Sequence, residues 1–460
     1  MVRWLAWIGL LPLVSTAAPT PADWVPVRWP WADAKSLELL AGSPVNCLLI
    51  KEVSADFVAA ANDRKLVTLA LIPAGADALA AAKKVIDAKV SGIVLEGEFP
   101  EGAAAKVREV AGDAPVIELT ARNRMPLGSK AAVLGTYQGV WPGVSTELSG
   151  THKSGPTGSV WIDTNTGFIR AALAWGDATV WIANQPPSGA VVTGARYLHA
   201  IADAAISGAR WVVAFDPDFA ARLRKGEADA LSDWRRMGSL IGYFEKHPEW
   251  RGMRAWGKLA LVQDPAKGGL LSGGILDMIA VKHTPVRPVA RQQLTAESLK
   301  DASMTVNVDA DSLTADQKEI LRAFARGGGT LLTGPPGWRD QANSGSITLD
   351  KAELERLNDI WRDVNSMVGR RNLGVRLFNV TSMLSNLIAG PDGQPVVLHL
   401  VNYSDYPVEN VAVHFLGTFK RAVLITPEGI EKKLEIYETE GGGGVDLEKV
   451  GVVATVRLEQ

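Results

Sequence analysis

The stretches Ser91-Gly-Ile-Val-Leu-Glu-Gly-Glu-Phe and Pro115-Val-Ile-Glu-Leu-Thr each run through apolar residues into a carboxylate or a hydroxyl group. Similar apolar runs with polar ends recur through the first half of the chain. They cover residues 46–52, 66–73, 91–99, 115–120, 131–138, 159–165, 179–185 and 210–216. Most are separated by Ala-rich segments of helical composition. Strands that alternate with helices at this spacing predict an α/β fold, a parallel sheet closed into a (β/α)8 TIM barrel.

Length and composition limit the class of protein. The chain has 460 residues, of which 47% are hydrophobic, so it can bury more than one core. At about 150 residues per domain, this length predicts about three domains. The net charge of -2 and the pI near 6.4 give no electrostatic basis for binding nucleic acid or an anionic membrane, and we expect neither as a partner.

The N-terminus has the features of a secretory signal peptide, which we place at residues 1–18. Arg3 precedes an apolar run from Trp4 to Val14, and Ser15-Thr-Ala supplies the small residues that signal peptidase accepts. The run is too short to span a bilayer. The alternative is a lipid-facing N-terminal anchor. The expected location is therefore secreted or periplasmic, with no membrane association after cleavage.

The rest of the chain divides into three parts. Trp24, Trp29 and Trp31 stand among prolines, and we interpret them as an extended lead-in across the bottom of the barrel, which we place at residues 24–255. Residues 256–370 show the pattern of a doubly wound α/β domain. Its expected elements are strands at 258–263, 288–291, 305–308 and 330–333 and a helix at 314–326 that ends in three glycines. From 371 to 460, period-two alternation between turns predicts a small antiparallel β-sandwich.

Two stretches carry a resemblance to a known family. They are Leu313-Thr-Ala-Asp-Gln-Lys-Glu-Ile-Leu-Arg-Ala-Phe-Ala-Arg-Gly-Gly-Gly-Thr-Leu and Leu398-His-Leu-Val-Asn-Tyr-Ser. With this three-part order, the chain resembles the family 42 β-galactosidases and their relatives. The resemblance implies a glycoside hydrolase barrel, a middle domain like a glutamine amidotransferase without its nucleophile, and a C-terminal sandwich. The family uses the middle domain for trimerisation, so the resemblance also implies a homo-oligomer formed through it.

The chain departs from that family at the expected catalytic centre. Family members carry Asn-Glu at the end of the fourth strand and a nucleophilic Glu at the end of the seventh. Here the fourth run reads Val116-Ile-Glu-Leu-Thr, so no Asn precedes Glu118, and the seventh ends in Asn184 and Gln185. Because a carboxamide cannot act as the nucleophile, the chemistry has either moved to other strands or been lost.

Glycoside hydrolysis needs two carboxyl groups, one neutral and one ionised. Alternation along the strands predicts that Glu118, Asp163 and Glu96 point into the barrel mouth, with Glu98 beside Glu96. We take Glu118 as nucleophile or base and Asp163 as acid, and hold Glu96 in reserve.

The same alternation places Glu52 and Asp216 at the rim of the barrel. The structural alternative for each of these carboxylates is that it caps a helix or pairs with a loop arginine such as Arg122 or Arg124. Capping is the favoured interpretation for Asp216, since Pro217 follows at once and an amphipathic segment begins there.

Aromatic and amide side chains enrich the same rim, and indole faces beside carboxamides suit sugars. The candidates for substrate binding are Tyr137, Gln138, Trp141, Asn165, Asn184 and Gln185, together with Glu96, Glu52 and Asp216. Trp141 lies in a predicted loop and is the better candidate for a sugar platform. Trp161 and Trp181 lie within strands and are interpreted as core residues.

These observations favour a secreted glycoside hydrolase-like protein that acts on an oligo- or polysaccharide. The alternative is a non-catalytic glycan-binding or scaffold protein with a degenerate barrel site. The six histidines show no metal-ligand spacing and no dinucleotide fingerprint appears, so we expect no metal and no cofactor. The single cysteine, Cys47, lies within the first run and is expected to be buried and inert.

Overall fold

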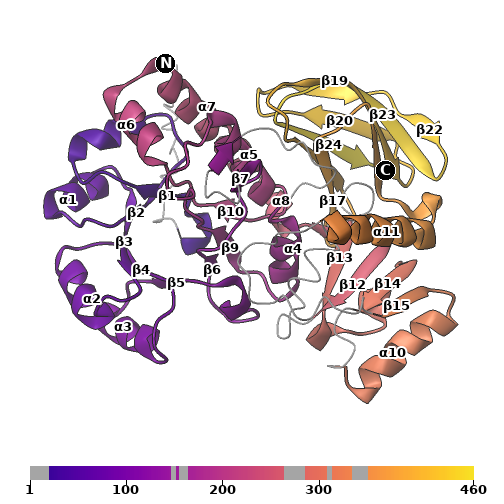
Figure 1. The fold of residues 1–460 in the computed structure, drawn as a ribbon, viewed down its shortest axis with the longest axis horizontal. Helices are drawn as coiled ribbons and strands as arrows, with labels where there is room; N and C mark the ends of the chain where they lie inside the picture. The colour runs from indigo at the N-terminus through magenta and orange to yellow at the C-terminus, as the bar shows by residue number, and fades with distance from the viewer. Residues whose placement is uncertain (1–19, 147–151, 155–163, 264–284, 308–312, 334–350) are drawn as a thin grey trace, which may run out of the picture.

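The computed structural model describes residues 20–146, 152–154, 164–263, 285–307, 313–333 and 351–460. The signal peptide proposed for residues 1–18 lies outside these ranges. Figure 1 shows the barrel on one side of the molecule, with the second parallel sheet and the C-terminal sandwich on the other. Within the described ranges, no helix combines the length and the apolar character needed to cross a membrane.

The barrel is a parallel sheet of eight strands. In spatial order they are β1 (Pro26–Trp29), β2 (Cys47–Ile50), β3 (Val67–Pro73), β4 (Gly92–Glu96), β5 (Val116–Thr120), β6 (Val133–Thr136), β9 (Thr179–Ile182) and β10 (Arg210–Trp211). A parallel bridge between Val27 and Val213 joins the first strand to the last, and the Arg28 amide donates to the Val213 carbonyl at 2.8 Å. The predicted barrel is therefore confirmed.

The structure differs from the predicted set of barrel strands at two segments. The segment interpreted as a lead-in contains β1, the first strand of the barrel, in which proline takes the first position, where a strand tolerates it. The run at 159–165 supplies no described strand. Residues 159–163 lie outside the described ranges, and Asn165 is the N-cap of the helix that follows. Because β6 pairs directly with β9, no strand fits between them.

Helices surround most of the barrel. They are α1 (Ala55–Asp63), α2 (Ala78–Asp87), α3 (Ala103–Ala111), α4 (Thr166–Ala174), α5 (Gly194–Ala205), α6 (Pro217–Lys225), α7 (Ala228–Glu245) and α8 (Glu249–Gly252). Side chains fix where several begin: Asp77 accepts from the Leu79 and Ala80 amides at the start of α2. The connection from β5 to β6 has only a 3-10 turn, η3 (Arg122–Arg124), so the outer face of these two strands has no long helix over it.

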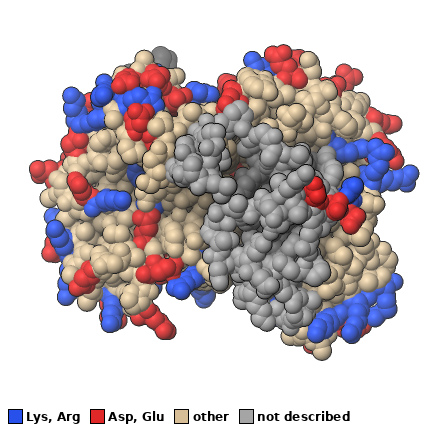
Figure 2. Space-filling view, in the orientation of Figure 1, with Lys and Arg blue, Asp and Glu red and all other residues tan. Residues whose placement is uncertain are grey.

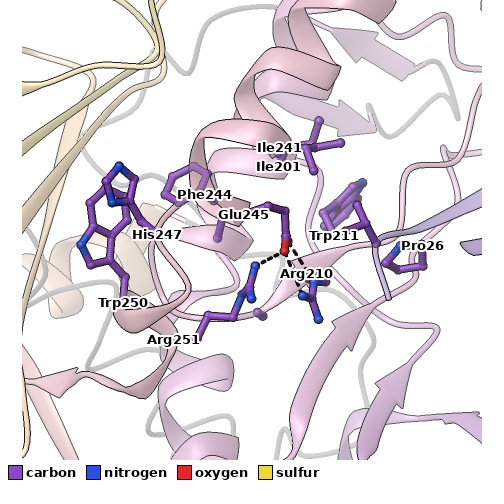
Figure 3. A pocket seen from close by; sticks show the side chains of 13 residues that line it. Pro26, Ile201, Arg210, Trp211, Ile241, Phe244, Glu245, His247, Trp250 and Arg251 are labelled. Atoms are coloured by element: carbon purple, nitrogen blue, oxygen red, sulfur yellow. Dashed lines mark hydrogen bonds and ion pairs between the residues drawn. The ribbon is translucent and has the colours of Figure 1, made fainter. Parts of the chain in front are cut away.

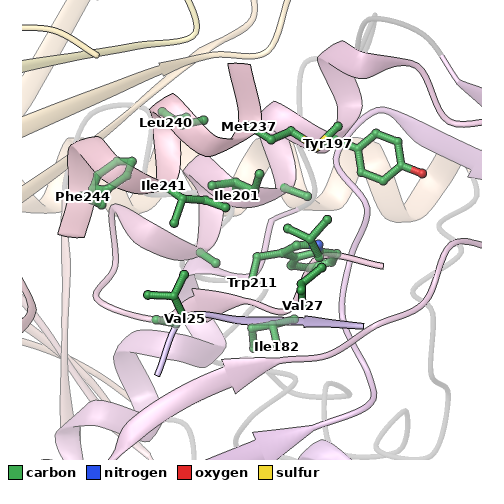
Figure 4. Packing of buried hydrophobic residues seen from close by; sticks show 14 of the residues in the cluster. Val25, Val27, Ile182, Tyr197, Ile201, Trp211, Met237, Leu240, Ile241 and Phe244 are labelled. Atoms are coloured by element: carbon green, nitrogen blue, oxygen red, sulfur yellow. The ribbon is translucent and has the colours of Figure 1, made fainter. Parts of the chain in front are cut away.

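Apolar packing on both faces of the sheet holds the barrel together. Outside, Ile201 of α5 and Ile241 of α7 pack in one cluster with Val27, Ile182 and Trp211 (Figure 4). Each such fully buried side chain contributes about 1.5–3 kcal/mol. Inside, a second cluster contains Cys47, Leu49, Leu69, Ile117, Leu119, Trp181 and Val212. Cys47 is buried as expected, and burial raises the pKa of its thiol well above its usual value.

A second parallel sheet follows the barrel, in the order β13 (Val286–Ala290), β12 (Leu259–Gln263), β14 (Met304–Asn307) and β15 (Thr330–Thr333). Helix α10 (Ala315–Arg326) begins at a capping box in which Thr314 and Gln317 satisfy each other's amides. The left-handed residue at its C-terminal end is Gly328, with φ +95°. This α/β unit has the strands and the helix that the sequence predicted.

The C-terminal part is a sandwich of two antiparallel sheets, as predicted. The first is β11 (Arg254–Ala255), β17 (Met383–Ala389), β18 (Val396–Asn402), β24 (Val453–Glu459), β20 (Arg421–Ile425) and β21 (Glu431–Leu434). The second is β16 (Val375–Phe378), β19 (Val408–Leu416), β23 (Gly442–Val450) and β22 (Tyr437–Thr439). A further helix, α11 (Lys351–Val368), precedes them.

The first sheet of the sandwich packs on the barrel through buried polar contacts. Tyr403 donates its hydroxyl to Asp203 of α5 at 2.9 Å, and Tyr243 of α7 donates to Thr455 Oγ1 at 2.5 Å. Paired polar groups of this kind require a definite geometry. The sandwich is therefore held in one orientation on α5 and α7.

Candidate functional site

Glu118 does not lie in the barrel mouth. Its neighbours Ile117 and Leu119 belong to the cluster inside the barrel, so alternation turns Glu118 outward. There its carboxylate pairs with Arg108 of α3, and both side chains are partly exposed. It lines a groove of about 500 Å³ with Ala131 and Val133, where no long helix covers the sheet. The prediction that Glu118 points into the mouth is wrong.

The predicted partner of Glu118, Asp163, lies outside the described residues. So does Trp161. The structure therefore does not show how the carboxyl groups of Glu118 and Asp163 lie relative to each other. Of the predicted site residues that the structure describes, Asn165 is the nearest to Asp163 in the sequence.

The C-terminal ends of β4, β5 and β6 meet around Glu98. Its carboxylate accepts the Ala121 amide at 3.1 Å, Arg124 Nη1 at 2.6 Å and the Tyr137 hydroxyl at 3.2 Å. Desolvation, then the hydrogen bond from its own hydroxyl to Glu98, raises the pKa of Tyr137. The Glu98 side chain remains 37% exposed. It is thus a carboxylate at the mouth that a ligand can reach, held by three donors.

Glu96 lies deeper in the barrel and forms a buried ion pair with Arg28 of β1. Arg28 Nη1 donates to Glu96 Oε2 at 3.2 Å, and Nη2 binds Oε1 and also donates to the Ala183 carbonyl at 2.7 Å. The two side chains are 9% and 12% exposed. Since Arg28 occupies both oxygens of Glu96, this carboxylate closes the floor of the mouth and is not free for proton transfer.

Asn165 is fully buried and its polar atoms are taken up by the protein. Its Oδ1 accepts the Val140 amide at 2.8 Å and a contact from Arg122, while its Nδ2 donates to Asp203 Oδ2 at 2.7 Å. The Asn165 backbone amide donates to the same carboxylate at 2.8 Å. Asn165 therefore fixes the loop after β6 against α4 and α5, and it does not face a ligand.

Trp141 is a core residue, contrary to its predicted role as a sugar platform. It is 4% exposed, packs edge-on against Tyr197 and Trp211, and donates Nε1 to the Gln185 carbonyl at 3.0 Å. The loop residue was expected to be exposed, but its ring turns inward under the loop. Trp181 is fully buried inside the barrel, as predicted.

The remaining amides lie on the same rim. Gln138 Oε1 accepts the Arg122 amide at 2.9 Å, and Asn184 Nδ2 donates to the Gly139 carbonyl at 2.8 Å. Both side chains are half-buried, whereas Gln185 is exposed. Of the predicted amides, Gln138, Asn184 and Gln185 are the ones that solvent reaches.

Asp216 caps α6, the alternative favoured from the sequence. Its Oδ1 accepts the Asp218 and Phe219 amides at 3.0 Å each, and Oδ2 accepts the Tyr197 hydroxyl at 2.8 Å. It is almost fully buried, so it binds no substrate in this conformation. Glu52 is exposed two residues beyond the end of β2.

Arg28 was not among the residues predicted from the sequence, and Glu98 was named only as a neighbour of Glu96. Arg28 was hidden because Pro26-Val-Arg-Trp was not recognised as a strand. The signal for Glu98 was its place two residues after Glu96, just beyond the C-terminal end of β4. Pairing with a loop arginine, proposed as the structural alternative for these carboxylates, applies to Glu98 and Arg124.

The chemistry available at the mouth follows from these groups. Within the described ranges, no three His, Cys, Asp or Glu side chains gather closely enough to hold a metal ion. Figure 2 shows acidic and basic side chains interspersed over the visible part of the described surface. The described mouth offers the exposed carboxylates of Glu98 and, at the rim, of Glu52, together with a phenol, arginines and carboxamides. These are groups that hydrogen-bond hydroxyl-rich ligands.

A separate pocket lies at the opposite end of the barrel, where β1 and β10 begin. Arg210 donates Nε and Nη2 to Glu245 at 3.0 Å each, and Arg251 pairs with the same carboxylate (Figure 3). Its volume of about 30 Å³ holds about one water molecule. This pocket is too small for a sugar, and its ion pairs join β10 to α7 and α8.

Several solved structures are similar to this chain in fold. The α-L-fucosidase isoenzyme 2 from Paenibacillus thiaminolyticus matches with a TM-score of 0.62 and 10% identity, over 95% of this chain and 99% of that one. A rhamnosidase from Novosphingobium sp. PP1Y matches with a TM-score of 0.45 and 12% identity, over 78% and 38% of the two chains. A catalytic mutant of a GH42 β-galactosidase from G. stearothermophilus matches with a TM-score of 0.37 and 9% identity, over 88% and 66%.

The fucosidase match spans nearly the whole of both chains and shows that the two proteins share a fold. The other two have TM-scores below 0.5, and nothing further is drawn from them. Family 42 β-galactosidases are among the structures that match at these lower scores. No protein-family description and no curated protein matches the sequence. At about 10% identity the likeness concerns the fold and leaves the activity to the site itself.

Proposed function

We propose that this protein acts on an oligo- or polysaccharide at the C-terminal mouth of its barrel, with Glu98 as the central residue. The observation that carries the proposal is the position of Glu98, where three strand ends meet and where its carboxylate stays partly open to solvent. Ligands of such barrels bind at the C-terminal ends of the strands. Glu98 replaces Glu118 in this assignment.

The donors around Glu98 fit it for a negatively charged role. Arg124, the Tyr137 hydroxyl and the Ala121 amide all point at the carboxylate, and together they stabilise its charge. In glycoside hydrolysis positive charge develops on the sugar ring, and an anionic carboxylate beside it stabilises the transition state or attacks the ring. Glu98 is therefore placed for that role.

Hydrolysis also needs a proton donor, and neither Glu96 nor Asp216 supplies one in this conformation. Arg28 binds Glu96 through both oxygens, and Asp216 is buried as a helix cap. Asp163 remains the acid proposed from the sequence. If no second carboxyl group acts, the mouth binds glycans without cleaving them. Glycan binding without cleavage is the second candidate function, and it is favoured because Glu96 and Asp216 are both held by other groups of the protein.

The experiment compares cleavage and binding in one set of variants. We would assay a panel of aryl glycosides, including α-L-fucosides and β-galactosides, with the wild type, Glu98→Gln and Tyr137→Phe. The fucoside is included because the protein with the related fold carries that activity in its name. Hydrolysis centred on Glu98 predicts that Glu98→Gln loses about 100-fold or more in turnover and keeps its fold.

The control is Glu118→Gln, which alters a carboxylate of the same type on the outer face of the barrel. A wild type that binds oligosaccharide and cleaves nothing in the panel favours the binding function. Cleavage that Glu98→Gln leaves unchanged removes Glu98 from the proposal. If neither the wild type nor any variant binds or cleaves a carbohydrate, the proposal that the ligand is a carbohydrate is wrong.

We also propose export and self-association, each on sequence grounds. Export depends on the apolar run from Trp4 to Val14 and the small residues after it, and N-terminal sequencing of exported protein should begin at Ala18 or Pro19. Retention of Met1 would contradict it. Self-association through the α/β unit depends on the family resemblance, and light scattering that shows a strict monomer at micromolar concentration would contradict that.

A further inference from the structure

The antiparallel sheet formed by β16, β19, β23 and β22 carries aromatic side chains on its outer face. The other sheet of the sandwich packs on the barrel through residues such as Val397, so this sheet is the layer farther from the barrel (Figure 1). Val413 of β19 and Val445 of β23 belong to the core of the sandwich. Alternation along the strands therefore turns their neighbours His414 and Gly444 to the outside.

The pairing register of the strands brings three rings together on that face. His414 lies directly opposite Gly444, which lies opposite Tyr437 of β22. Phe378 of β16 is a diagonal neighbour of His414, since its own partner on β19 is Ala412. The ring centres of Phe378 and His414 are 4.7 Å apart, and those of His414 and Tyr437 are 5.7 Å apart. We call these three side chains the aromatic row.

Gly444 is required for this arrangement, because a Cβ atom there would stand 2.5 Å from Tyr437 Cε2 and 3.0 Å from His414 Cδ2. Both rings therefore lie over the backbone of β23, and both are half-buried. Aromatic cover of a strand glycine stabilises a sheet, which accounts for Tyr437. It does not account for Phe378, which lies opposite Ala412 and is 42% exposed. The aromatic row thus keeps ring surface that a ligand can reach.

Polar groups of both charges border the aromatic row. Asp446 is an exposed diagonal neighbour of Tyr437 and accepts its hydroxyl at 3.1 Å through Oδ1. Arg376 lies opposite His414 and donates Nη2 to the Glu440 carbonyl at 3.2 Å. A guanidinium has five N–H donors and a carboxylate two acceptor oxygens, so one such contact leaves others for a ligand. Burial lowers the pKa of His414, so its imidazole is neutral at neutral pH and the two charges beside the row balance.

This combination fits a neutral oligosaccharide. Sugars present apolar faces edged by hydroxyl groups, which suit aromatic rings beside hydrogen-bonding side chains. A protein partner would need a broad apolar patch, but of the large apolar side chains that are strongly exposed in the described ranges only Phe378 lies on this sheet. The planes of neighbouring rings are inclined by 55° and 79°. A flat crystalline surface cannot contact rings so inclined, whereas a single soluble chain can turn from one to the next.

We propose that the aromatic row of the sandwich binds a neutral, soluble oligosaccharide chain, with the rings against sugar faces. Asp446 and Arg376 hydrogen-bond its hydroxyl groups. The class of ligand rests on the carbohydrate function proposed for the barrel, but the surface and the residues are different ones. A second binding surface on the same chain keeps a bound polysaccharide at a high effective concentration around the mouth.

The test titrates the full protein with cellohexaose, xylohexaose, mannohexaose, galactohexaose and maltohexaose. Hexagalacturonate is the acidic comparison. Isothermal titration should show that at least one neutral hexasaccharide binds about tenfold or more tighter than its own monosaccharide, because several rings contact several sugar units. Hexagalacturonate should bind more weakly than that neutral chain, since the charges beside the row balance.

The decisive variant is Phe378→Ala, which removes an exposed ring and should leave the fold intact. It should weaken binding of that hexasaccharide about tenfold or more. Phe378→Tyr keeps a ring at the same place and should retain the affinity. Tyr406→Ala is the matched control, since Tyr406 is an aromatic residue of the sandwich that is 63% exposed and lies outside the row. It should change nothing.

The result is separable from that for the mouth. Phe378→Ala should leave the turnover of aryl glycosides unchanged, and Glu98→Gln should leave binding at the aromatic row in place. Binding that Glu98→Gln abolishes and Phe378→Ala does not affect would overturn this proposal and leave the mouth as the binding site. No neutral hexasaccharide bound, or equal effects of Phe378→Ala and Tyr406→Ala, would overturn it as well. Binding through Phe378 without cleavage of any glycoside supports the row and contradicts hydrolysis at Glu98.

Discussion

Arg28 of β1 and Glu96 of β4 form an ion pair inside the barrel, 68 residues apart in the sequence. The same guanidinium also reaches the Ala183 carbonyl just after β9. One side chain thus connects three strands that are not neighbours in the sheet. The pair separates the apolar interior below from the polar mouth above, and it sets the depth to which a ligand can enter.

We expect Arg28→Met to destabilise the protein by about 3–5 kcal/mol, because it leaves Glu96 buried without its partner. The double variant Arg28→Met with Glu96→Gln should recover part of that loss, since it removes the uncompensated charge. Urea unfolding followed by tryptophan fluorescence measures both. As a control, Arg108→Met removes the partner of Glu118 at the surface and should cost about 1 kcal/mol or less. Equal effects of the two single variants would contradict the buried role of Arg28.

Glu118→Gln should leave carbohydrate turnover and affinity unchanged. The side chain points away from the barrel interior and pairs with Arg108 on a partly exposed surface. Its loss removes one surface pair, worth about 1 kcal/mol at most. Kinetics on whichever glycoside the wild type cleaves, or glycan affinity if it cleaves none, provides the measurement. A large loss of activity with an intact fold would return Glu118 to the site.

The error over Glu118 has a physical cause. Alternation of polar and apolar residues shows which face of a strand is buried only when the other face is polar. A barrel strand packs apolar residues both into the barrel and against the helices outside. Ile117 and Leu119 were taken as helix-facing, and they face the interior. Seven of the eight predicted barrel strands, the second parallel sheet and the antiparallel sandwich were confirmed. These features depend on the length of the apolar runs and on the turn residues between them, and the sequence contains both.

The details of the mouth were harder to predict because they depend on contacts between distant loops. Trp141 was placed correctly in the loop after β6, whereas Asn165, predicted at the end of a strand, is the N-cap of α4. Both side chains face the protein. Nothing local in Val140-Trp-Pro-Gly shows that Tyr197 and Trp211 cover the indole. Arg28 was missed because Pro26 and Trp29 led us to interpret this segment as an extended lead-in and not as a strand.

Trp141→Phe should lower stability without lowering glycan affinity. The change removes the hydrogen bond from Nε1 to the Gln185 carbonyl and leaves a gap beside Tyr197, and we expect a loss of about 1–3 kcal/mol. Chemical unfolding measures the stability, and titration with oligosaccharide at a temperature where the variant is folded measures the affinity. If affinity falls while stability is unchanged, Trp141 is a platform for sugar after all.

Acid should destabilise the protein through two buried histidines, His199 and His399. Burial lowers the pKa of each to about 3, from an ordinary value near 6.5. The unfolded chain therefore binds more protons between those values. Stability is greatest above pH about 6.5 and falls as the pH drops toward 3, by at most about 1.4 kcal/mol per pH unit for each histidine.

The variant His399→Gln tests this directly, because glutamine keeps a hydrogen-bonding group near Thr455, the present partner of His399 Nδ1 at 2.8 Å, and cannot be charged. The free energy of unfolding, measured in urea between pH 6.5 and 5, should depend less steeply on pH in the variant, by up to one proton. His414→Gln is the matched control: burial also lowers the pKa of His414, but the side chain is only half-buried, so the slope should change less. An unchanged slope in His399→Gln would show that this histidine is protonated in the folded protein or that acid acts elsewhere.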